Sequence, residues 1–596
     1  MRRPLALLGP MLALALTARA APLDCQAGGM PVPFPGGATG GAMGGVVQPG
    51  QAPARDRRPG EPRDGTAVIR GYVVAADTGA PVRRAQVRAF AMGGEGSGLA
   101  QTDADGRFEI AKLPAGRYTV SAQRSGYVTQ SFGQRAPNQP GTPIEISDGQ
   151  VVEKLTFALA RGGAITGRVV DEFGEPVSSA QVTVQRYAYM GGARRLVGAG
   201  AEGGADRTDD LGQFRLYGLP PGEYYVMATL RAFEFVPMST AATSFAPPSD
   251  GYAPTYYPGT SNVGEARRLT VRAGQELPNV TFALTATRVG RILGRVTTSA
   301  GEPYIGGMIM VAPRDQGMMF GGMMSGAQVR PDGTFQTAPL APGAYTLTVQ
   351  PMGNRGNPDA EVARVDVTVN GEDVRDVFIV TGRGGIIRGR VVTDDGTVPP
   401  FRPQQMRIFA QPEDPTRPGF GVAPGTVRDD WTFEVSGLTD HVRLRWSIDM
   451  PGGGWSMKSA MKDNLDLADV AVDVGPGQVV EDVEIALTRK VTELSGLVTD
   501  DRNVPVTDAT VVVFPENRDL WTFSSRHVRT ARPDVNGKYT VRLTPTDGYR
   551  AIAVQGLEQG EALDPDFLGR ALEAAVTAEI REGESRTLDL RLATVK

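Results

Sequence analysis

The chain has 596 residues and a net charge of −4, and it contains one cysteine and two histidines. A single cysteine excludes an intramolecular disulfide and a zinc or redox site built from several cysteines. The slightly acidic balance argues against nucleic acid as a partner, because binding to phosphates needs a basic surface.

Residues 1–20 form the first predicted element, an export signal. Arg2 and Arg3 precede an apolar run from Leu5 to Leu16, and Ala18-Arg19-Ala20 supplies the small residues of a cleavage site. The apolar run is too short to cross a bilayer of ~30 Å as a helix. We therefore expect a Sec-type signal peptide, and a periplasmic or secreted mature chain without a transmembrane segment.

Residues 21–64 follow as a stretch dominated by glycine and proline, without apolar periodicity. Such a composition cannot bury enough surface to offset its ordering entropy, so we interpret the stretch as a disordered linker. Cys25 lies near the cleavage point, but Asp24 precedes it where a lipoprotein signal has a small residue. We expect no lipid anchor at Cys25.

The rest of the chain repeats at a period of about 100 residues. The first repeated signal is Ile/Leu-x-Gly-x-Val, whose alternation at period two predicts a half-buried strand. A glycine on the buried face lets a facing backbone or large side chain approach closely. The five glycines are Gly71, Gly167, Gly294, Gly389 and Gly496.

Further signals follow in a constant order within each copy. A Gly/Pro turn precedes a second strand, and a polar turn precedes an aromatic strand and a Leu-Pro-x-Gly-x-Tyr corner. We expect the aromatic residues to lie in the cores; they are Phe108, Phe214, Phe335 and Tyr539. The fourth copy departs most, since Trp431 replaces a turn glycine and Leu438-Thr439-Asp440-His441 replaces the corner.

A copy of about 100 residues is large enough to own a hydrophobic core. Several short strands separated by turns favour an antiparallel β-sandwich. We therefore predict an all-β chain of five tandem β-sandwich domains, here called units 1 to 5. Their predicted ranges are 65–160, 161–287 with an aromatic loop insertion, 288–381, 382–490, which is divergent, and 491–596.

These signals together resemble the carboxypeptidase regulatory-like domain. The resemblance covers residues 65 to 596 and is strongest in the first three copies. It implies a transthyretin-like (prealbumin-like, Ig-like) sandwich, of the kind grouped with carbohydrate-binding-like folds. In that family the domain is commonly an accessory module, which makes it weak evidence for a function.

Catalytic motifs are missing from the sequence. A zinc carboxypeptidase needs a His-x-x-Glu pair, but neither His441 nor His527 is followed by glutamate at that spacing. Neither histidine lies in a nucleophile motif of a Ser–His–Asp enzyme. Asp103 and Asp105 fit either a polar turn or a calcium loop, and we favour the turn because Gln101 occupies the position of a further calcium ligand. We predict no catalytic residue, no metal site and no cofactor.

Two groups of residues are candidates for binding. Aromatic side chains in loops of units 1 and 2 could present rings to a sugar or peptide, or could cover a domain edge. They are Tyr127, Phe132, Tyr252, Tyr256 and Tyr257. Methionines next to glycines, at Met92, Met190 and Met318 to Met324, fit flexible hairpin tips better than a copper(I) site.

The sequence therefore predicts an exported, non-catalytic protein of a bacterial cell envelope that acts as a multidomain scaffold. The alternative is an array that binds carbohydrate or peptide through the tyrosine-rich loops. A third hypothesis, an enzyme of unknown type, has no motif behind it. The expected partner is a glycan or an envelope protein.

Overall fold

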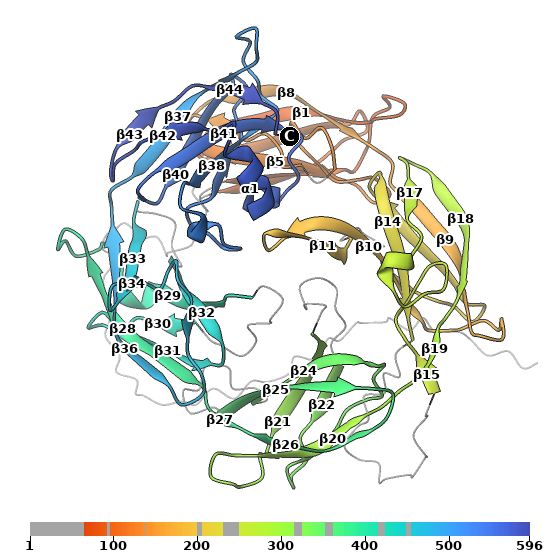
Figure 1. The fold of residues 1–596 in the computed structure, drawn as a ribbon. Helices are drawn as coiled ribbons and strands as arrows, with labels where there is room; N and C mark the ends of the chain where they lie inside the picture. The colour runs from red at the N-terminus through yellow and green to blue at the C-terminus, as the bar shows by residue number, and fades with distance from the viewer. Residues whose placement is uncertain are drawn as a thin grey trace, which may run out of the picture. The chain divides into compact units, whose positions relative to one another are not determined.

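The computed structural model describes residues 65–91, 96–137, 139–199, 205–230, 250–314, 325–351, 361–414, 424–448 and 454–595. These residues belong to one of two compact parts of the chain, Pro62–Lys596. The predicted signal peptide, the linker, Cys25, Met92 and Met318 to Met324 lie outside the described residues. Strands dominate, and α1 (Pro565–Ala571) is the only α-helix in these ranges (Figure 1), so the all-β prediction is confirmed.

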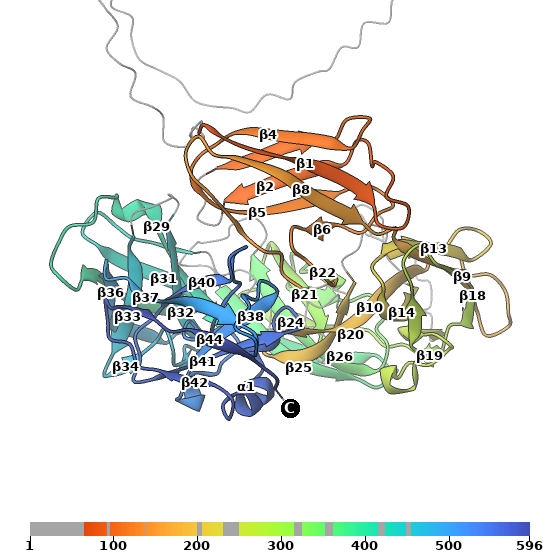
Figure 2. The ribbon, with the colours of Figure 1, turned by 90° about the horizontal axis from the view of Figure 1, so that it is seen from above.

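Unit 1 places eight strands in two sheets (Figure 2). One sheet has the order β4-β1-β8 and the other β3-β2-β5-β6, with β7 paired to β5. The bounds are β1 Ala67–Ala75, β2 Gln86–Ala91, β3 Ser97–Gln101, β4 Arg107–Leu113, β5 Gly116–Gln123, β6 Gln130–Ser131, β7 Ile144–Ile146 and β8 Val151–Leu159.

Unit 2 repeats this plan with sheets β13-β9-β18 and β11-β10-β14-β16, where β12 pairs with β10 and β17 with β14. A short extra pair joins β15 to β19, which crosses the predicted boundary of the unit. The bounds are β9 Gly163–Val170, β10 Gln181–Met190, β11 Ala193–Gly198, β12 Ala205–Arg207, β13 Gln213–Leu219, β14 Gly222–Thr229, β15 Asp250–Tyr252, β16 Thr255–Tyr256, η1 Val263–Glu265, β17 Leu269–Val271, β18 Glu276–Ala283 and β19 Ala286–Arg288.

Unit 3 has sheets β23-β20-β26 and β22-β21-β24-β25-β27. The strand β27 comes after the predicted boundary of unit 3 but pairs with β25. The bounds are β20 Ile292–Thr297, β21 Gly307–Pro313, β22 Ser325–Gln328, β23 Thr334–Gln336, β24 Gly343–Pro351, β25 Glu361–Val369, β26 Val374–Val380 and β27 Gly382–Arg383.

Unit 4 extends its first sheet to β31-β28-β36-β33-β34, and its second is β30-β29-β32-β35. The hairpin β33–β34 therefore covers an edge of β36. The bounds are β28 Gly385–Thr393, η3 Pro403–Gln405, β29 Met406–Pro412, β30 Gly425–Thr426, β31 Thr432–Leu438, β32 His441–Ile448, β33 Ser456–Lys462, β34 Leu465–Asp466, β35 Val472–Asp473 and β36 Val479–Thr488.

Unit 5 joins its strands into one sheet, β39-β38-β41-β44-β37-β40, because β44 pairs with both β37 and β41. The strand β42 pairs with β41, and β43 pairs with β37. The bounds are β37 Thr492–Thr499, β38 Ala509–Pro515, η4 Arg518–Leu520, β39 Arg529–Ala531, β40 Lys538–Leu543, β41 Tyr549–Gln555, η5 Glu561–Leu563, β42 Val576–Ala578, β43 Ser585–Thr587 and β44 Leu590–Ala593.

Separate clusters of buried apolar side chains lie within the ranges 67–159, 165–284, 292–379, 387–487 and 494–590. A further cluster packs Phe567 and Leu568 of α1 against β38 and β41. The aromatic residues expected in the cores are buried, with at most 5% of each exposed: Phe108, Phe214, Phe335 and Tyr539. Burial of one such ring contributes roughly 1.5–3 kcal/mol, so each cluster can stabilise its own sheets.

One feature of strand pairing corrects the prediction of purely antiparallel sheets. In every unit the first strand pairs in parallel with a closing strand: β1 with β8, β9 with β18, β20 with β26, β28 with β36, and β37 with β43 and β44. A parallel pair needs a long crossover, and the intervening strands of the other sheet supply it. Turn signals alone do not encode this pairing, because the paired strands lie far apart in sequence.

The repeated glycine lies where three groups crowd together. Gly71 pairs with Phe108 across β1 and β4. A Cβ atom added to Gly71 would lie 2.0 Å from the Leu155 carbonyl oxygen and 2.8 Å from the Phe108 ring. The same pairing joins Gly167 to Phe214, Gly294 to Phe335, Gly389 to Phe433 and Gly496 to Tyr539. The glycine therefore gives space to both the closing strand and the aromatic ring.

The predicted tyrosine corner is also formed. Tyr118, Tyr224 and Tyr345 each donate a hydroxyl hydrogen bond to the carbonyl four residues earlier, at 2.9, 2.6 and 2.8 Å. Burial raises the pKa of Tyr224 and of Tyr345 to about 12. The corner therefore satisfies a hydroxyl that would otherwise be buried without a partner.

The polar turn before the aromatic strand depends on an aspartate and a left-handed residue. The Asp103 carboxylate accepts hydrogen bonds from the amides of Asp105 and Arg107, at 2.9 and 2.8 Å, as expected of an Asx turn. In unit 4, Trp431 adopts φ of 63° where Gly106 of unit 1 has 74°. The described residues contain no group of three or more His, Cys, Asp or Glu side chains that could hold a metal ion.

The close approach at the repeated glycine yields a first prediction. Replacing Gly389 by alanine places a methyl group 1.9 Å from the Val483 carbonyl oxygen. We expect the variant to lose about 1–3 kcal/mol of stability through overpacking. Urea unfolding followed by tryptophan fluorescence measures this, because Trp431, Trp446 and Trp455 pack against the same core.

Gly475 of the same unit is the matched control. An added methyl group there meets its nearest atom, in the Gln478 side chain, at 3.7 Å, which is an ordinary contact. Gly475→Ala should leave the urea midpoint unchanged. An equal loss in both variants would contradict the role assigned to the repeated glycine.

Candidate functional site

The tyrosines predicted to bind a ligand in unit 2 contact the core. Tyr256 is 5% exposed and its hydroxyl donates to Gln185 at 3.3 Å. The Tyr257 ring packs edge-on against Phe282, with 6.0 Å between ring centroids. Tyr252 is partly exposed, and its hydroxyl donates to Glu172 at 2.6 Å. The structure therefore places Tyr256 where it cannot present a ring to a ligand without rearrangement.

The candidates in unit 1 are half-buried. Phe132 packs edge-on against Phe157, with 6.3 Å between ring centroids. The Arg161 guanidinium lies 5.5 Å from the centroid of the Tyr127 ring, within cation–π range. Binding of a sugar or peptide by these loops stays a prediction, supported best by the partial exposure of Tyr127 and Tyr252.

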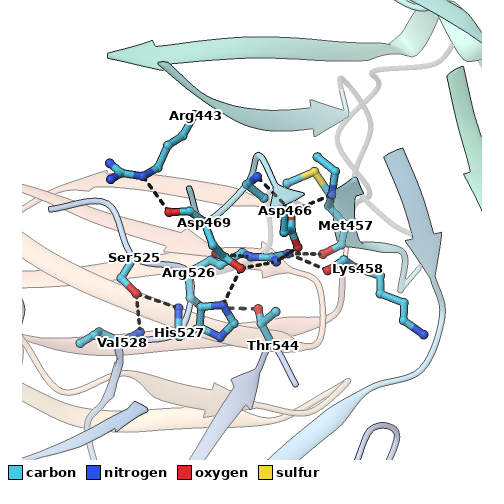
Figure 3. A network of polar contacts seen from close by, with 12 residues as sticks. Arg443, Met457, Lys458, Asp466, Asp469, Ser525, Arg526, His527, Val528 and Thr544 are labelled. Atoms are coloured by element: carbon cyan, nitrogen blue, oxygen red, sulfur yellow. Dashed lines mark hydrogen bonds and ion pairs between the residues drawn. The ribbon is translucent and has the colours of Figure 1, made fainter. Parts of the chain in front are cut away.

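A network of largely buried charges lies elsewhere, where segments of units 4 and 5 meet (Figure 3). We call it the Arg526 cluster and define it by six residues, of which Figure 3 labels all but Arg445. Asp466 ends β34 and Asp469 follows it, whereas Arg526 and His527 precede β39. Arg443 and Arg445 come from β32.

Every donor of the Arg526 guanidinium has a partner. Nε donates to Asp469 at 2.8 Å, and Nη2 donates to Asp469 at 2.7 Å and to Asp466 at 2.6 Å. Nη1 donates to the carbonyl oxygens of Met457 and Lys458, at 3.3 and 2.7 Å (Figure 3). Because arginine has five N–H donors in a planar fork, this pocket is complementary to its whole head group.

The two aspartates are fixed by other hydrogen bonds. Asp466 accepts from the amides of Ala460 and Ala468, at 2.8 and 3.0 Å, which hold its carboxylate toward Arg526. Burial alone would raise the pKa of Asp469, but hydrogen bonds from Arg526 and His527 outweigh it and hold that pKa well below its usual range. Asp469 is therefore an ionised partner of the arginine at neutral pH.

Two further arginines extend the contact. Arg443 is 5% exposed and donates to the Asp469 carbonyl at 2.9 Å and to Glu413 at 2.8 Å. Arg445 donates to the carbonyl of Ser524 at 2.7 Å. Burial and the charge of Arg526 lower the pKa of Arg445 to about 10, so it stays charged at neutral pH.

His527 does not have the geometry of a catalytic base. Its Nε2 lies 3.0 Å from Asp469 and its Nδ1 lies 3.3 Å from the Tyr549 hydroxyl, which itself donates to the Thr544 carbonyl. Ser525 accepts from the amide of His527 through its hydroxyl and does not contact the ring nitrogens. Because His527 is 3% exposed and both ring nitrogens are engaged, it cannot take a proton from an external substrate.

A second contact between the same units consists of charges nearer the surface. Lys458 on β33 lies 2.9 Å from Glu582 of unit 5, and Lys490 lies 3.8 Å from the same carboxylate. These side chains are partly exposed, so each pair contributes less than the Arg526 cluster. Residues 489–491 alone connect β36 to β37, and the polar contacts on either side of this joint restrict it.

No sequence pattern predicted this cluster. The extra hairpin β33–β34 belongs to unit 4, the copy that departs most from the repeat, and the segment before β39 belongs to unit 5. Each supplies one side of the contact, so the departures from the repeat were the signal that could have found it. His441, the other histidine, is 54% exposed at its side chain and lies outside the cluster.

Comparison with protein families supports the resemblance in one unit. The carboxypeptidase regulatory-like domain matches residues 68–160, which lie within unit 1. Unit 1 therefore contains such a domain, and five tandem copies of it remain a prediction. No curated protein matches the chain.

Solved structures of tandem β domains are similar to the chain at low identity. A streptococcal ancillary pilin is 15% identical, with 53% of this chain and 98% of that chain covered, at a TM-score of 0.19. The Bacillus anthracis TIE protein is 12% identical, covering 72% and 73%, at 0.15. Two B repeats of the Staphylococcus aureus collagen-binding protein are 12% identical, covering 71% and 98%, at 0.13. Identities this low carry no information on what the chain binds.

Among the described residues, no helix has the length and apolar character needed to span a bilayer.

The Arg526 cluster yields a second prediction. Replacing Arg526 by methionine removes the guanidinium that pairs with the largely buried carboxylates of both Asp466 and Asp469. We expect a loss of about 3–5 kcal/mol, the usual cost of removing one partner from a buried ion pair. Urea unfolding monitored by tryptophan fluorescence of units 4 and 5 measures it.

Arg390 provides the control for this substitution. It lies 2.6 Å from Glu484 but is 68% exposed, so Arg390→Met should change stability by less than about 1 kcal/mol. If both variants lost the same amount, burial would not be what makes the Arg526 cluster matter.

A third prediction concerns acid. Because the pKa of Asp469 is depressed in the folded protein, its stabilising contribution is present above the unfolded value of about 3.9 and is lost as pH falls below it. The difference in urea midpoint between wild type and Asp469→Asn should stay constant from pH 7 to about pH 5 and shrink below about pH 4. A difference that does not depend on pH would exclude an ionised Asp469.

Proposed function

We propose that the chain is an exported, non-catalytic scaffold of the cell surface whose fourth and fifth units are held together as one rigid segment. The observation that supports this most directly is the Arg526 cluster, which joins two units through largely buried charges. A buried, fully paired cluster of this kind fixes geometry, because partial separation would expose unpaired charges.

The remaining support comes from the cores. The described parts of the five predicted units have separate apolar clusters, and the connections are short, such as residues 160–162 between β8 and β9. Units that are stable by themselves and joined by few residues can hold bound partners at defined separations. Export through the predicted signal peptide, and a glycan or an envelope protein as the partner, belong to the same proposal.

The fourth prediction tests the rigid segment by distance measurement in the full chain. Spin labels on Val398→Cys in unit 4 and Val535→Cys in unit 5 use positions that are 82% and 63% exposed, with Cys25 replaced by serine. We expect a narrow distribution of label distances by pulsed electron spin resonance. The distribution should broaden when Arg526→Met is added.

The control for this measurement is Arg390→Met, which removes only an exposed ion pair within unit 4 and should leave the distribution narrow. A broad distribution in the unsubstituted protein would contradict the rigid segment. Turnover of a peptide or polysaccharide substrate by the purified chain would contradict the non-catalytic function.

A further inference from the structure

Unit 3 exposes apolar side chains at positions where the other units do not. Phe378 and Val380 on β26 are 72% and 66% exposed, and Ile305 in the turn after β20 is 73% exposed. Phe378 and Val380 alternate with the buried Ile379, so both lie on the outer face of the sheet. Exposed apolar groups gathered at one end of a sheet often mark a binding surface.

The strand registers identify the equivalent residues in the other units. In each of these units the repeated glycine pairs with one residue of the closing strand, and the next residue along that strand is the one compared. It is Phe378 in unit 3, Thr156 in unit 1, Thr281 in unit 2 and Glu484 in unit 4. Two residues further along, Val380 corresponds to Ala158, Ala283 and Ala486. The apolar pair is therefore absent from units 1, 2 and 4, so the fold does not require it.

The change also affects a neighbouring charge. In unit 4, Arg390 pairs with Glu484 across β28 and β36, at 2.6 Å. In unit 3 the same register sets Arg295 beside Phe378, and no ion pair of Arg295 is found within the described residues. The outer face of this sheet thus combines two apolar side chains with an arginine that has no acidic partner there.

The strand β26 is also an edge. Within the described part of unit 3 it pairs only with β20. In unit 4 the equivalent strand β36 pairs with β28 on one side and with β33 on the other. The pairing of β33 is antiparallel, with Ala460 opposite Ile485 and Met461 opposite Glu484. The chain itself therefore shows that this edge of the fold accepts one more antiparallel strand.

We propose that the free edge of β26 in unit 3 binds an extended segment of a partner protein, which adds to the sheet as an antiparallel strand in the way that β33 adds to β36. Main-chain hydrogen bonds would supply part of the affinity, and the side chains of the outer face would supply the specificity. On its outer face the fitting segment carries apolar side chains, which cover Phe378 and Val380, and one acidic side chain, which pairs with Arg295.

The probe for this proposal is a fluorescein-labelled peptide of nine residues that alternates valine with threonine and has one glutamate at its centre. Fluorescence anisotropy with the full chain should show saturable binding. The double variant Phe378→Thr/Val380→Ala, which copies the residues of unit 2, should weaken binding at least tenfold. Hydrogen exchange should show added protection of the β26 amides when the peptide is bound.

Phe90→Thr is the matched control. Phe90 is 64% exposed, but its strand β2 is flanked by β3 and β5, so no edge is available there. The control should bind the peptide as the wild type does. A version of the peptide with proline in place of threonine should not bind, since proline cannot donate to the new ladder.

Any of the following results with the peptide would overturn the proposal. They are the absence of saturable binding, equal binding by the double variant, and binding that leaves the β26 amides unprotected. A wild-type dimer in sedimentation that the double variant dissociates would also overturn it, because the occupant would then be a second copy of this chain. The outcome is independent of the spin-label experiment, which concerns units 4 and 5 alone.

Discussion

The fold of each unit depends on one crowded point, where the first strand passes between an aromatic ring and the backbone of the closing strand. In unit 1 these are the Phe108 ring and the Leu155 carbonyl. Glycine, at position 71, is the only residue type that fits between them. The same three-part contact in all five units brings both ends of each unit into one sheet. This contact closes the sandwich, because it pairs the first strand with the closing strand, which lies far from it in sequence.

This constraint also explains why so much of the fold could be predicted. A glycine within an alternating strand and an aromatic residue at a fixed distance are local patterns, so all-β architecture and the buried aromatic residues were visible in the sequence. The parallel pairing was not, because no local pattern records which distant strand lies beside β1. Residues such as Lys154, Asn279 and Asp376, whose positive φ marks a bulge in each closing strand, carry no common side chain that could have signalled it.

The candidate sites could be predicted less well than the fold, and for a physical reason. Tyrosine has an apolar body and a polar tip, so a tyrosine-rich loop fits a ligand surface and a core equally well. Tyr256 and Tyr257 pack against the core because Gln185 accepts the Tyr256 hydroxyl hydrogen bond and the Phe282 ring contacts the Tyr257 ring. Both partners are distant in sequence. The Arg526 cluster escaped for the same reason, since its carboxylates and its guanidinium lie in different copies of the repeat.

The units differ from one another where the sequence departs from the repeat. Every copy keeps the glycine and the aromatic ring, and this leaves the outer faces and the edges of the sheets free to change without loss of the core. Unit 4 uses that freedom to add β33–β34, which covers an edge and supplies Asp466 to the joint with unit 5. In the described part of unit 3 the same edge is open, and Phe378 and Val380 lie beside it. Because these differences lie at the joints between units and at the edges of the sheets, we expect binding sites at those places and not in the conserved cores.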